Sequence, residues 1–341
     1  MNNQNIIYNV GVNPSHIAIT PNDKYAYVTN SNNYSIPGSD NVTVLNLHKG
    51  HAKLTIYDES FVEPYRIAID NDGRYAYVCN SGSPQSEGEL GTVSVINIFT
   101  NTVTKIITGF DGPGGIVLTK KFAYVTNYGA PGGKQSGNGN TVSVVNLKTK
   151  QIVDTIIVDQ APSSLILSPC HSYLYVINYT DGTPEKGTLN VICTRTNTVI
   201  KTITGFFGPF GIAISEDGHY GYVTNFGSNN FSPYGSTVSV VDLKKFRIIK
   251  NIETGIQPAG IAISRNFAYV SNYNALYAGS NYTNLTPGLG SISVICLEDN
   301  KIVGAAIPIG QCPSTLILSH DEKNLYICNY VQNTVTELEL E

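Results

Sequence analysis

Short stretches of alternating polar and apolar residues run along the whole chain, and one four-residue phrase, Tyr-Val-Thr-Asn or a close variant, recurs among them. Its seven copies occupy residues 27–30, 77–80, 124–127, 175–178, 222–225, 269–272 and 326–329. Successive copies begin 50, 47, 51, 47, 47 and 57 residues apart. A near-constant period of roughly 40–50 residues is typical of repeat architectures. The pattern therefore predicts one structural unit that is repeated seven times.

Each repeat is predicted to form four short strands and no helix. In the clearest copy the strands are expected at residues 210–214, 220–225, 236–243 and 247–252. The third of these alternates Ser or Thr with Val, a period-two pattern of β-branched residues that suits a pleated strand. Four-stranded units at this spacing bury their faces best when they are arranged radially as a propeller.

The second strand of each repeat carries the phrase. In the first copy, Tyr27 and Thr29 are predicted to point to one face of the sheet, and Ala26 and Val28 to the other. Both sets suit burial, as expected for a sheet that is packed between two neighbours. The asparagine that ends the strand, Asn30 in this copy, can bond to nearby backbone groups or adopt a left-handed conformation. We expect it to fix the following loop rather than to bind a ligand.

The two ends of the chain predict how the ring closes. The chain stops after the third strand of the last repeat, at residues 334–340, and it begins with a stretch, residues 5–10, that matches a fourth strand. Pairing the two would remove an exposed sheet edge. We therefore predict an all-β fold, a seven-bladed β-propeller of four-stranded antiparallel blades in one domain, residues 1–341. The predicted blades are about 14–58, 64–109, 113–159, 162–205, 209–255, 258–309, and 313–341 together with 4–11.

The repeated phrase, with Gly-Ile-Ala-Ile-Ser before it and Thr-Val-Ser-Val-Ile-Asn after it, resembles the YVTN family of β-propellers over essentially the whole chain. That family is found in prokaryotic cell-surface and secreted proteins. Some relatives bind nucleic acid, and more distant seven-bladed relatives are lactonases. The family motif is structural, so the resemblance implies the fold and assigns no catalytic residue.

Composition restricts the classes of function and the compartment. The net charge of the 341 residues is only -4, which disfavours a surface devoted to nucleic acid. No apolar run of 18 residues is present and the start of the chain lacks the features of a secretory signal. We expect a soluble protein, either cytoplasmic or reaching a cell surface or virion by a non-classical route. The six cysteines form no Cys-x-x-Cys pair, and we expect free, buried thiols.

Long, variable loops are predicted on one face of the ring, which we call the top face. It carries the loops between the second and third strands and the loops that join successive repeats, and such loops on a rigid scaffold are where binding usually occurs. Aromatic residues among Asn, Ser and Gly are typical of recognition surfaces. The candidate binding residues in these loops are Tyr65, Phe110, Tyr128, Tyr179, Phe207, Phe210, Phe226, Tyr273 and Tyr330. The alternative is that those directly after the phrase cover the blades as packing.

A second candidate site lies at the start of the first strand of each repeat. The residues in this column are His16, Arg66, Gly115, Ser164, Gly211, Gly260 and Thr315, of which most are small. His16 and Arg66 break the pattern in adjacent blades and are predicted to hold a carboxylate or phosphate at the mouth of the central channel. The alternative is an ordinary ion pair between Arg66 and Glu63 with a satisfied histidine.

No metal-binding, nucleophile-elbow or phosphate-loop motif is present. We therefore predict a non-enzymatic binding scaffold without cofactor or metal, expected to be a monomer, whose top face contacts a protein or glycan. One alternative is a lactonase-like hydrolase at the channel mouth. The other is nucleic-acid binding through the opposite, bottom face, whose turns contain more basic than acidic residues. Nucleic acid is the less favoured partner, and no membrane contact is expected.

Overall fold

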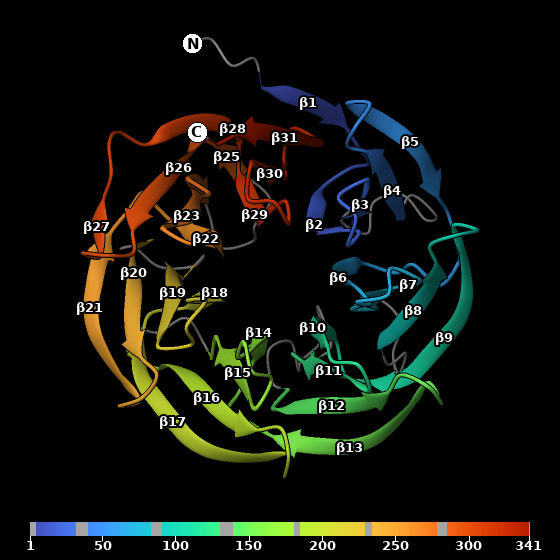
Figure 1. Cartoon of the computed structure of the whole chain (residues 1–341), viewed down its shortest axis with the longest axis horizontal. Coiled ribbons are helices and arrows are strands. Elements are labelled where there is room, and N and C mark those ends of the chain that lie inside the picture. Colours follow the sequence, from blue (N-terminus) through green and yellow to red (C-terminus); the bar gives the residue numbers. More distant parts are fainter. Residues whose placement is uncertain are drawn as a thin grey trace.

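The computed structural model describes residues 5–31, 40–82, 91–129, 139–180, 185–228, 234–277 and 285–340. Seven antiparallel sheets are arranged around a common axis, and the strands of each sheet follow one another in order from the axis to the rim (Figure 1). No helix is present in these described ranges. The prediction of an all-β, seven-bladed propeller is confirmed.

The blades follow one another in sequence, and the innermost strand of each comes first. Blade 1 contains β2 (Pro14–Ile19), β3 (Tyr25–Asn30), β4 (Asn41–Asn46) and β5 (His51–Ile56). Blade 2 contains β6 (Pro64–Ile69), β7 (Tyr75–Asn80), β8 (Gly91–Asn97) and β9 (Thr102–Phe110), and blade 3 contains β10 (Pro113–Leu118), β11 (Phe122–Asn127), β12 (Thr141–Asn146) and β13 (Gln151–Ile157). Blade 4 contains β14 (Pro162–Leu167), β15 (Tyr173–Asn178), β16 (Gly187–Cys193) and β17 (Thr198–Phe206), and blade 5 contains β18 (Pro209–Ile214), β19 (Tyr220–Gly227), β20 (Tyr234–Asp242) and β21 (Arg247–Glu253).

Blade 6 departs from the regular plan. It contains β22 (Pro258–Ile263), β23 (Phe267–Asn272) and β26 (Leu289–Cys296), and its outer strand is divided into β27 (Lys301–Ile302) and β28 (Ile307–Gln311). Both outer pieces pair with β26. A separate two-stranded hairpin, β24 (Ala275–Tyr277) and β25 (Leu285–Pro287), is inserted between β23 and β26. This blade therefore has both a broken outer edge and an elaborated top loop.

Blade 7 joins the two ends of the chain. It contains β29 (Pro313–Leu318), β30 (Asn324–Asn329), β31 (Thr334–Glu339) and, as its outer strand, β1 (Ile6–Asn9). β1 pairs with β31 from Ile6 opposite Glu337 to Asn9 opposite Thr334, which confirms the predicted closure. The carboxylate of the buried Glu337 accepts hydrogen bonds from the hydroxyls of Tyr8 and Tyr326. This polar joint links residues that are 329 positions apart in the sequence.

The hydrophobic core lies between the blades. Ala26 and Val28 pack with Tyr326 of the preceding blade, whereas Tyr27 packs with Ala76 and Val78 of the following one. The predicted division of the second strand into two buried faces is therefore confirmed. All six cysteines are free. Only Cys79, Cys312 and Cys328 are buried, contrary to the expectation of six buried thiols. Cys193 and Cys296 are half-buried, and Cys170 is exposed because it lies in the turn between β14 and β15.

The third residue of the phrase connects neighbouring blades. Each inner strand has an irregular register near its start, which leaves an N–H group for a side chain to satisfy. In blade 5, the Thr224 hydroxyl accepts this hydrogen bond from the Gly211 N–H at 2.8 Å and donates to the Ala259 carbonyl of blade 6 at 2.8 Å. Thr29 and Ser271 form equivalent contacts. A single hydroxyl thus stabilises both its own blade and the interface with the next.

Replacing Thr224 with valine is expected to lower the free energy of unfolding by about 1–3 kcal/mol. The change keeps the side-chain shape but leaves a buried N–H and a buried carbonyl without a hydrogen bond. Equilibrium urea denaturation measures the effect. Ile177→Val is the matched control in blade 4, where the same position has no hydroxyl, and the hydrogen-bond explanation is wrong if the two variants lose equal stability.

The fourth residue of the phrase holds the second strand to the third. In all seven blades, the amide of this asparagine donates to two side-chain oxygens on the third strand. In blades 3, 5 and 6 its carbonyl oxygen also accepts an N–H from the loop that precedes the blade, from Asp111, Phe207 and Gly255 respectively. We call this arrangement the asparagine clamp. The prediction that the asparagine fixes a loop is therefore confirmed for blades 3, 5 and 6, whereas in the other four blades its carbonyl oxygen has no partner among the described residues.

Candidate functional site

Aromatic side chains form a continuous arc at the top edge of blades 5 to 7. The ring centroids of Phe210 and Phe226 are 5.4 Å apart, those of Phe226 and Tyr273 are 5.9 Å apart, and those of Tyr273 and Tyr330 are 6.4 Å apart. These distances fall in the range of favourable aromatic pairs. Buried Cys312 belongs to the same cluster. We call these four aromatic residues the aromatic arc.

Two further aromatic residues lie next to the arc. The hydroxyl of Tyr179 in blade 4 donates to the Gly227 carbonyl of blade 5 at 2.9 Å. The ring of Phe207 lies against the same glycine, since a Cβ added to Gly227 would be 3.2 Å from Phe207 Cε1. The structure therefore brings together candidates from blades 4 to 7. At blades 1 and 2 the phrase is followed by Ser31 and Ser81, so this column contributes no aromatic ring there.

The candidate aromatic residues differ in exposure. Phe110 is fully buried, and Phe226 and Tyr273 are only 6% and 8% exposed. Their side chains act as packing, and we leave Phe110 out of the proposed binding surface. The residues that are partly exposed are Tyr65, Tyr128, Tyr179, Phe207, Phe210 and Tyr330. These six are the candidates that a partner can reach.

The residues at the start of the first strand, where the second candidate site was predicted, are small in most blades because neighbouring blades approach closely there. A Cβ added to Gly211 would lie 2.4 Å from the Ala259 carbonyl oxygen, and one added to Gly260 would lie 2.7 Å from that of Ser314. Real Cβ atoms do not approach an oxygen so closely. His16 and Arg66 occupy the same column in blades 1 and 2. These two large side chains therefore depart from the pattern that close packing imposes on Gly211 and Gly260.

Arg66 has no acidic partner in the described part of the chain. Its guanidinium lies over the Tyr65 ring at 5.8 Å from the centroid, and no hydrogen bond or ion pair to it is found within the described part of the chain. The expected ion pair with Glu63 is not formed; the Glu63 backbone has a φ of 52° and its N–H donates to the Asp40 carboxylate. Burial lowers the pKa of Arg66, and the nearby Tyr65 and Cys79 oppose this shift.

His16 is also incompletely satisfied. Its Nδ1 is buried and has no hydrogen-bond partner among the residues that the structure describes, whereas the ring forms a hydrogen bond with the backbone of Ile67. Burial and, to a smaller extent, the charge of Arg66 lower the pKa of His16 well below its usual value, so the ring is neutral at pH 7. A buried nitrogen without a partner costs about 1–3 kcal/mol. The predicted alternative of a satisfied histidine is therefore wrong.

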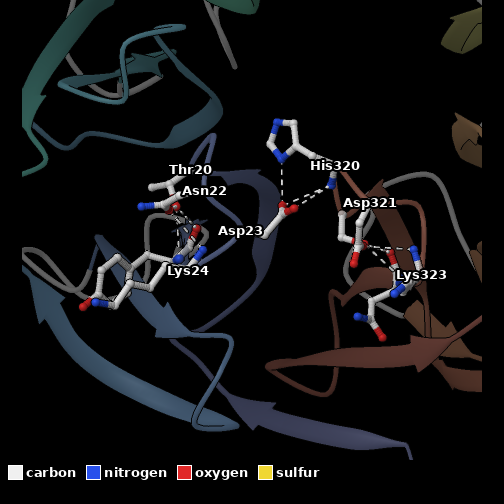
Figure 2. A network of polar contacts seen from close by, with 10 residues as sticks. Thr20, Asn22, Asp23, Lys24, His320, Asp321 and Lys323 are labelled. Atoms are coloured by element: carbon white, nitrogen blue, oxygen red, sulfur yellow. Dashed lines mark hydrogen bonds and ion pairs between the residues drawn. The ribbon is translucent and has the colours of Figure 1, made fainter.

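On the bottom face, polar turns connect adjacent blades. Figure 2 shows the junction of blades 7 and 1, where His320 Nδ1 lies 2.7 Å from the Asp23 carboxylate and the His320 N–H donates to both of its oxygens. Lys150 of blade 3 similarly donates to the Tyr77 hydroxyl of blade 2. A hollow between blades 5 and 6 is lined by the charged residues Glu216, Asp217, Arg265 and Glu298. This hollow is more acidic than basic, so it does not favour the nucleic-acid alternative.

The described residues contain no group of three or more His, Cys, Asp or Glu side chains placed to hold a metal ion. They also contain no helix with the length and hydropathy needed to span a bilayer.

Comparison with known proteins supports the propeller fold. No family model matches the chain. The chain is 34% identical over 124 residues to the seven-bladed beta-propeller protein Rv1057 of Mycobacterium tuberculosis, and the alignment covers 35% of this chain and 26% of that relative. The structure is similar to that of Kuenenia stuttgartiensis hydrazine synthase, with a TM-score of 0.77, 19% identity and 96% of each chain covered. This second likeness shows the fold alone. The chain is a seven-bladed β-propeller, and its membership of the YVTN family stays a prediction.

Proposed function

We propose that the protein is a non-enzymatic binding scaffold that presents its top face to a protein or glycan partner. The continuity of the aromatic arc supports this most directly, because rings from three successive blades contact one another where the second strands end. Tyr and Phe side chains held in this way offer a large contact area and lose little entropy on binding. The arc is fixed from below by the blades, which is typical of recognition loops on a rigid scaffold.

The partly exposed residues at the arc define the proposed contact. Phe207 and Phe210 are accessible from the loop that precedes β18 and from the start of β18, and the Phe207 backbone is held by the asparagine clamp of Asn225. Phe226 and Tyr273 form the buried support. Substitutions at the two accessible residues should therefore report on binding, whereas substitutions at the support would also reduce stability.

Replacing Phe207 with alanine is expected to weaken partner binding by at least about tenfold, the effect of losing one aromatic anchor. Affinity capture after chemical cross-linking identifies a protein partner, and a glycan array identifies a carbohydrate one. Phe99→Ala is the matched control, since Phe99 is 94% exposed in the turn between β8 and β9 on the bottom face. A partner that binds the wild type and both variants equally would refute the top-face proposal.

A further inference from the structure

Arg66 and His16 form a second feature of the top face that the aromatic arc does not include. They lie on β6 and β2, the innermost strands of adjacent blades. The Ser15 hydroxyl, directly before His16, donates to the carbonyl of Tyr65, directly before Arg66, at 3.2 Å, so the two strands place His16 and Arg66 next to each other. Both occupy a column in which close packing of the blades otherwise selects glycine, serine or threonine. Packing therefore gives no reason for these two large side chains.

The guanidinium of Arg66 is available for an anion. It lies over the Tyr65 ring, is half-buried and meets neither a carboxylate nor a carbonyl acceptor among the described residues. Arg74 in the same blade is the opposite case, since its side chain is 72% exposed and is paired with Asp72 at 3.1 Å. A planar guanidinium with one face against an aromatic ring keeps its edge free to pair with both oxygens of a carboxylate.

The free nitrogen of His16 is a hydrogen-bond acceptor. We assign the contact with the Ile67 backbone to Nε2, because Nδ1 has no partner among the described residues; this contact raises the pKa of His16, as expected when an imidazole N–H donates to a carbonyl oxygen. In the neutral ring Nδ1 then carries the lone pair and no hydrogen. Its missing partner must be a donor, such as a hydroxyl or an N–H. The pair offers one positive charge and one acceptor, which fits a monocarboxylate better than a doubly charged phosphate.

We propose that Arg66, His16 and Tyr65 form a binding site for a carboxylate that has a hydroxyl or N–H donor on the adjacent carbon. Arg66 pairs with the carboxylate, His16 Nδ1 accepts the hydrogen bond, and the Tyr65 ring holds the guanidinium in place. Two sources share this chemistry: a small 2-hydroxy acid, and the C-terminal residue of a peptide, whose amide N–H neighbours its carboxylate. The site is independent of the aromatic arc, so either proposal can fail without the other.

Fluorine NMR titration of the full chain tests the site with three matched probes. They are 4-fluoromandelate, 4-fluorophenylacetate, which lacks the hydroxyl, and 4-fluoromandelamide, which lacks the charge. We expect 4-fluoromandelate to bind most tightly and the amide not to bind. Arg66→Ala should weaken 4-fluoromandelate binding by at least about tenfold, and His16→Phe should abolish its advantage over 4-fluorophenylacetate. Arg74→Ala should leave all three probes unchanged.

Equal binding of 4-fluoromandelate and its amide would overturn the proposal, and so would an Arg66→Ala variant that binds 4-fluoromandelate as tightly as the wild type. The proposal is also wrong if neither 4-fluoromandelate nor N-acetyl-4-fluorophenylalanine shows saturable binding. Arg66→Lys keeps the charge and removes the planar fork, so it replaces Arg66→Ala if that variant fails to fold, and an intermediate loss is expected. N-acetyl-4-fluorophenylalanine, compared with its amide, distinguishes the two sources. Tighter binding of this probe than of 4-fluoromandelate identifies a peptide C-terminus, and the reverse order identifies a free hydroxy acid.

Discussion

Replacing Tyr8 with alanine is expected to lower the free energy of unfolding by about 3–5 kcal/mol, the usual cost of deleting a buried aromatic side chain. Tyr8 is 1% exposed on β1 and donates to Glu337, so the variant loses both packing and a hydrogen bond at the joint between the chain ends. Equilibrium urea denaturation followed by circular dichroism measures the change. Size-exclusion chromatography detects any self-association through an exposed β31 edge.

Ile7→Ala is the matched control for this prediction. Ile7 lies on the same strand but is 62% exposed, so its replacement should cost little. Equal losses from Tyr8→Ala and Ile7→Ala would contradict the importance of the joint. The double variant Tyr8→Ile/Glu337→Val introduces the residue types found at these positions in blade 1, Ile56 and Val44. We expect the double variant to be more stable than Glu337→Val alone. The single variant leaves the Tyr8 hydroxyl without its acceptor, whereas the double variant places two apolar side chains at this contact.

The second large effect is expected at the asparagine clamp of blade 5. Asn225→Ala should lower the free energy of unfolding by about 2–4 kcal/mol, because Asn225 donates to Thr237 and Ser239 and also accepts the Phe207 N–H. Asn80→Ala should cost about 1 kcal/mol less, since the carbonyl oxygen of Asn80 has no partner among the described residues. Urea denaturation compares the two variants.

Hydrogen exchange separates the loop contribution from the strand contribution. The Phe207 amide should exchange faster in Asn225→Ala than in the wild type, whereas Asn80→Ala should leave its rate unchanged. If the Phe207 amide keeps its protection in Asn225→Ala, the clamp does not order this loop. Such a result would also remove one reason for assigning Phe207 to the binding surface.

The sequence was sufficient to predict the ring because the repeat places equivalent residues at equivalent positions. The period identified seven units, and the alternation of Tyr27 and Thr29 with Ala26 and Val28 predicted two buried faces. The loop-fixing role of the asparagine followed from the chemistry of a short amide at a strand end. The unusual size of His16 and Arg66 was likewise visible against the small residues of their column.

Contacts that depend on three-dimensional detail could not be predicted in this way. The role of Thr224 between blades depends on an irregular register in the inner strand, which leaves no mark in the sequence pattern. Glu337 reads as an ordinary polar residue near a chain end, and only its pairing with β1 places it between two tyrosine hydroxyls. Glu63 is near Arg66 in sequence, but the two residues do not form the expected ion pair. Sequence proximity did not reveal that Glu63 has a positive φ and that its N–H donates to Asp40.

The asparagine clamp has a consequence for how such a chain can diverge. The clamp joins the two strands that flank each top loop through side chains of the strands themselves. Blade 6 carries an inserted hairpin and keeps its clamp intact. Insertions and substitutions within these loops can therefore accumulate in evolution without loss of the ring, and new specificities can arise one blade at a time.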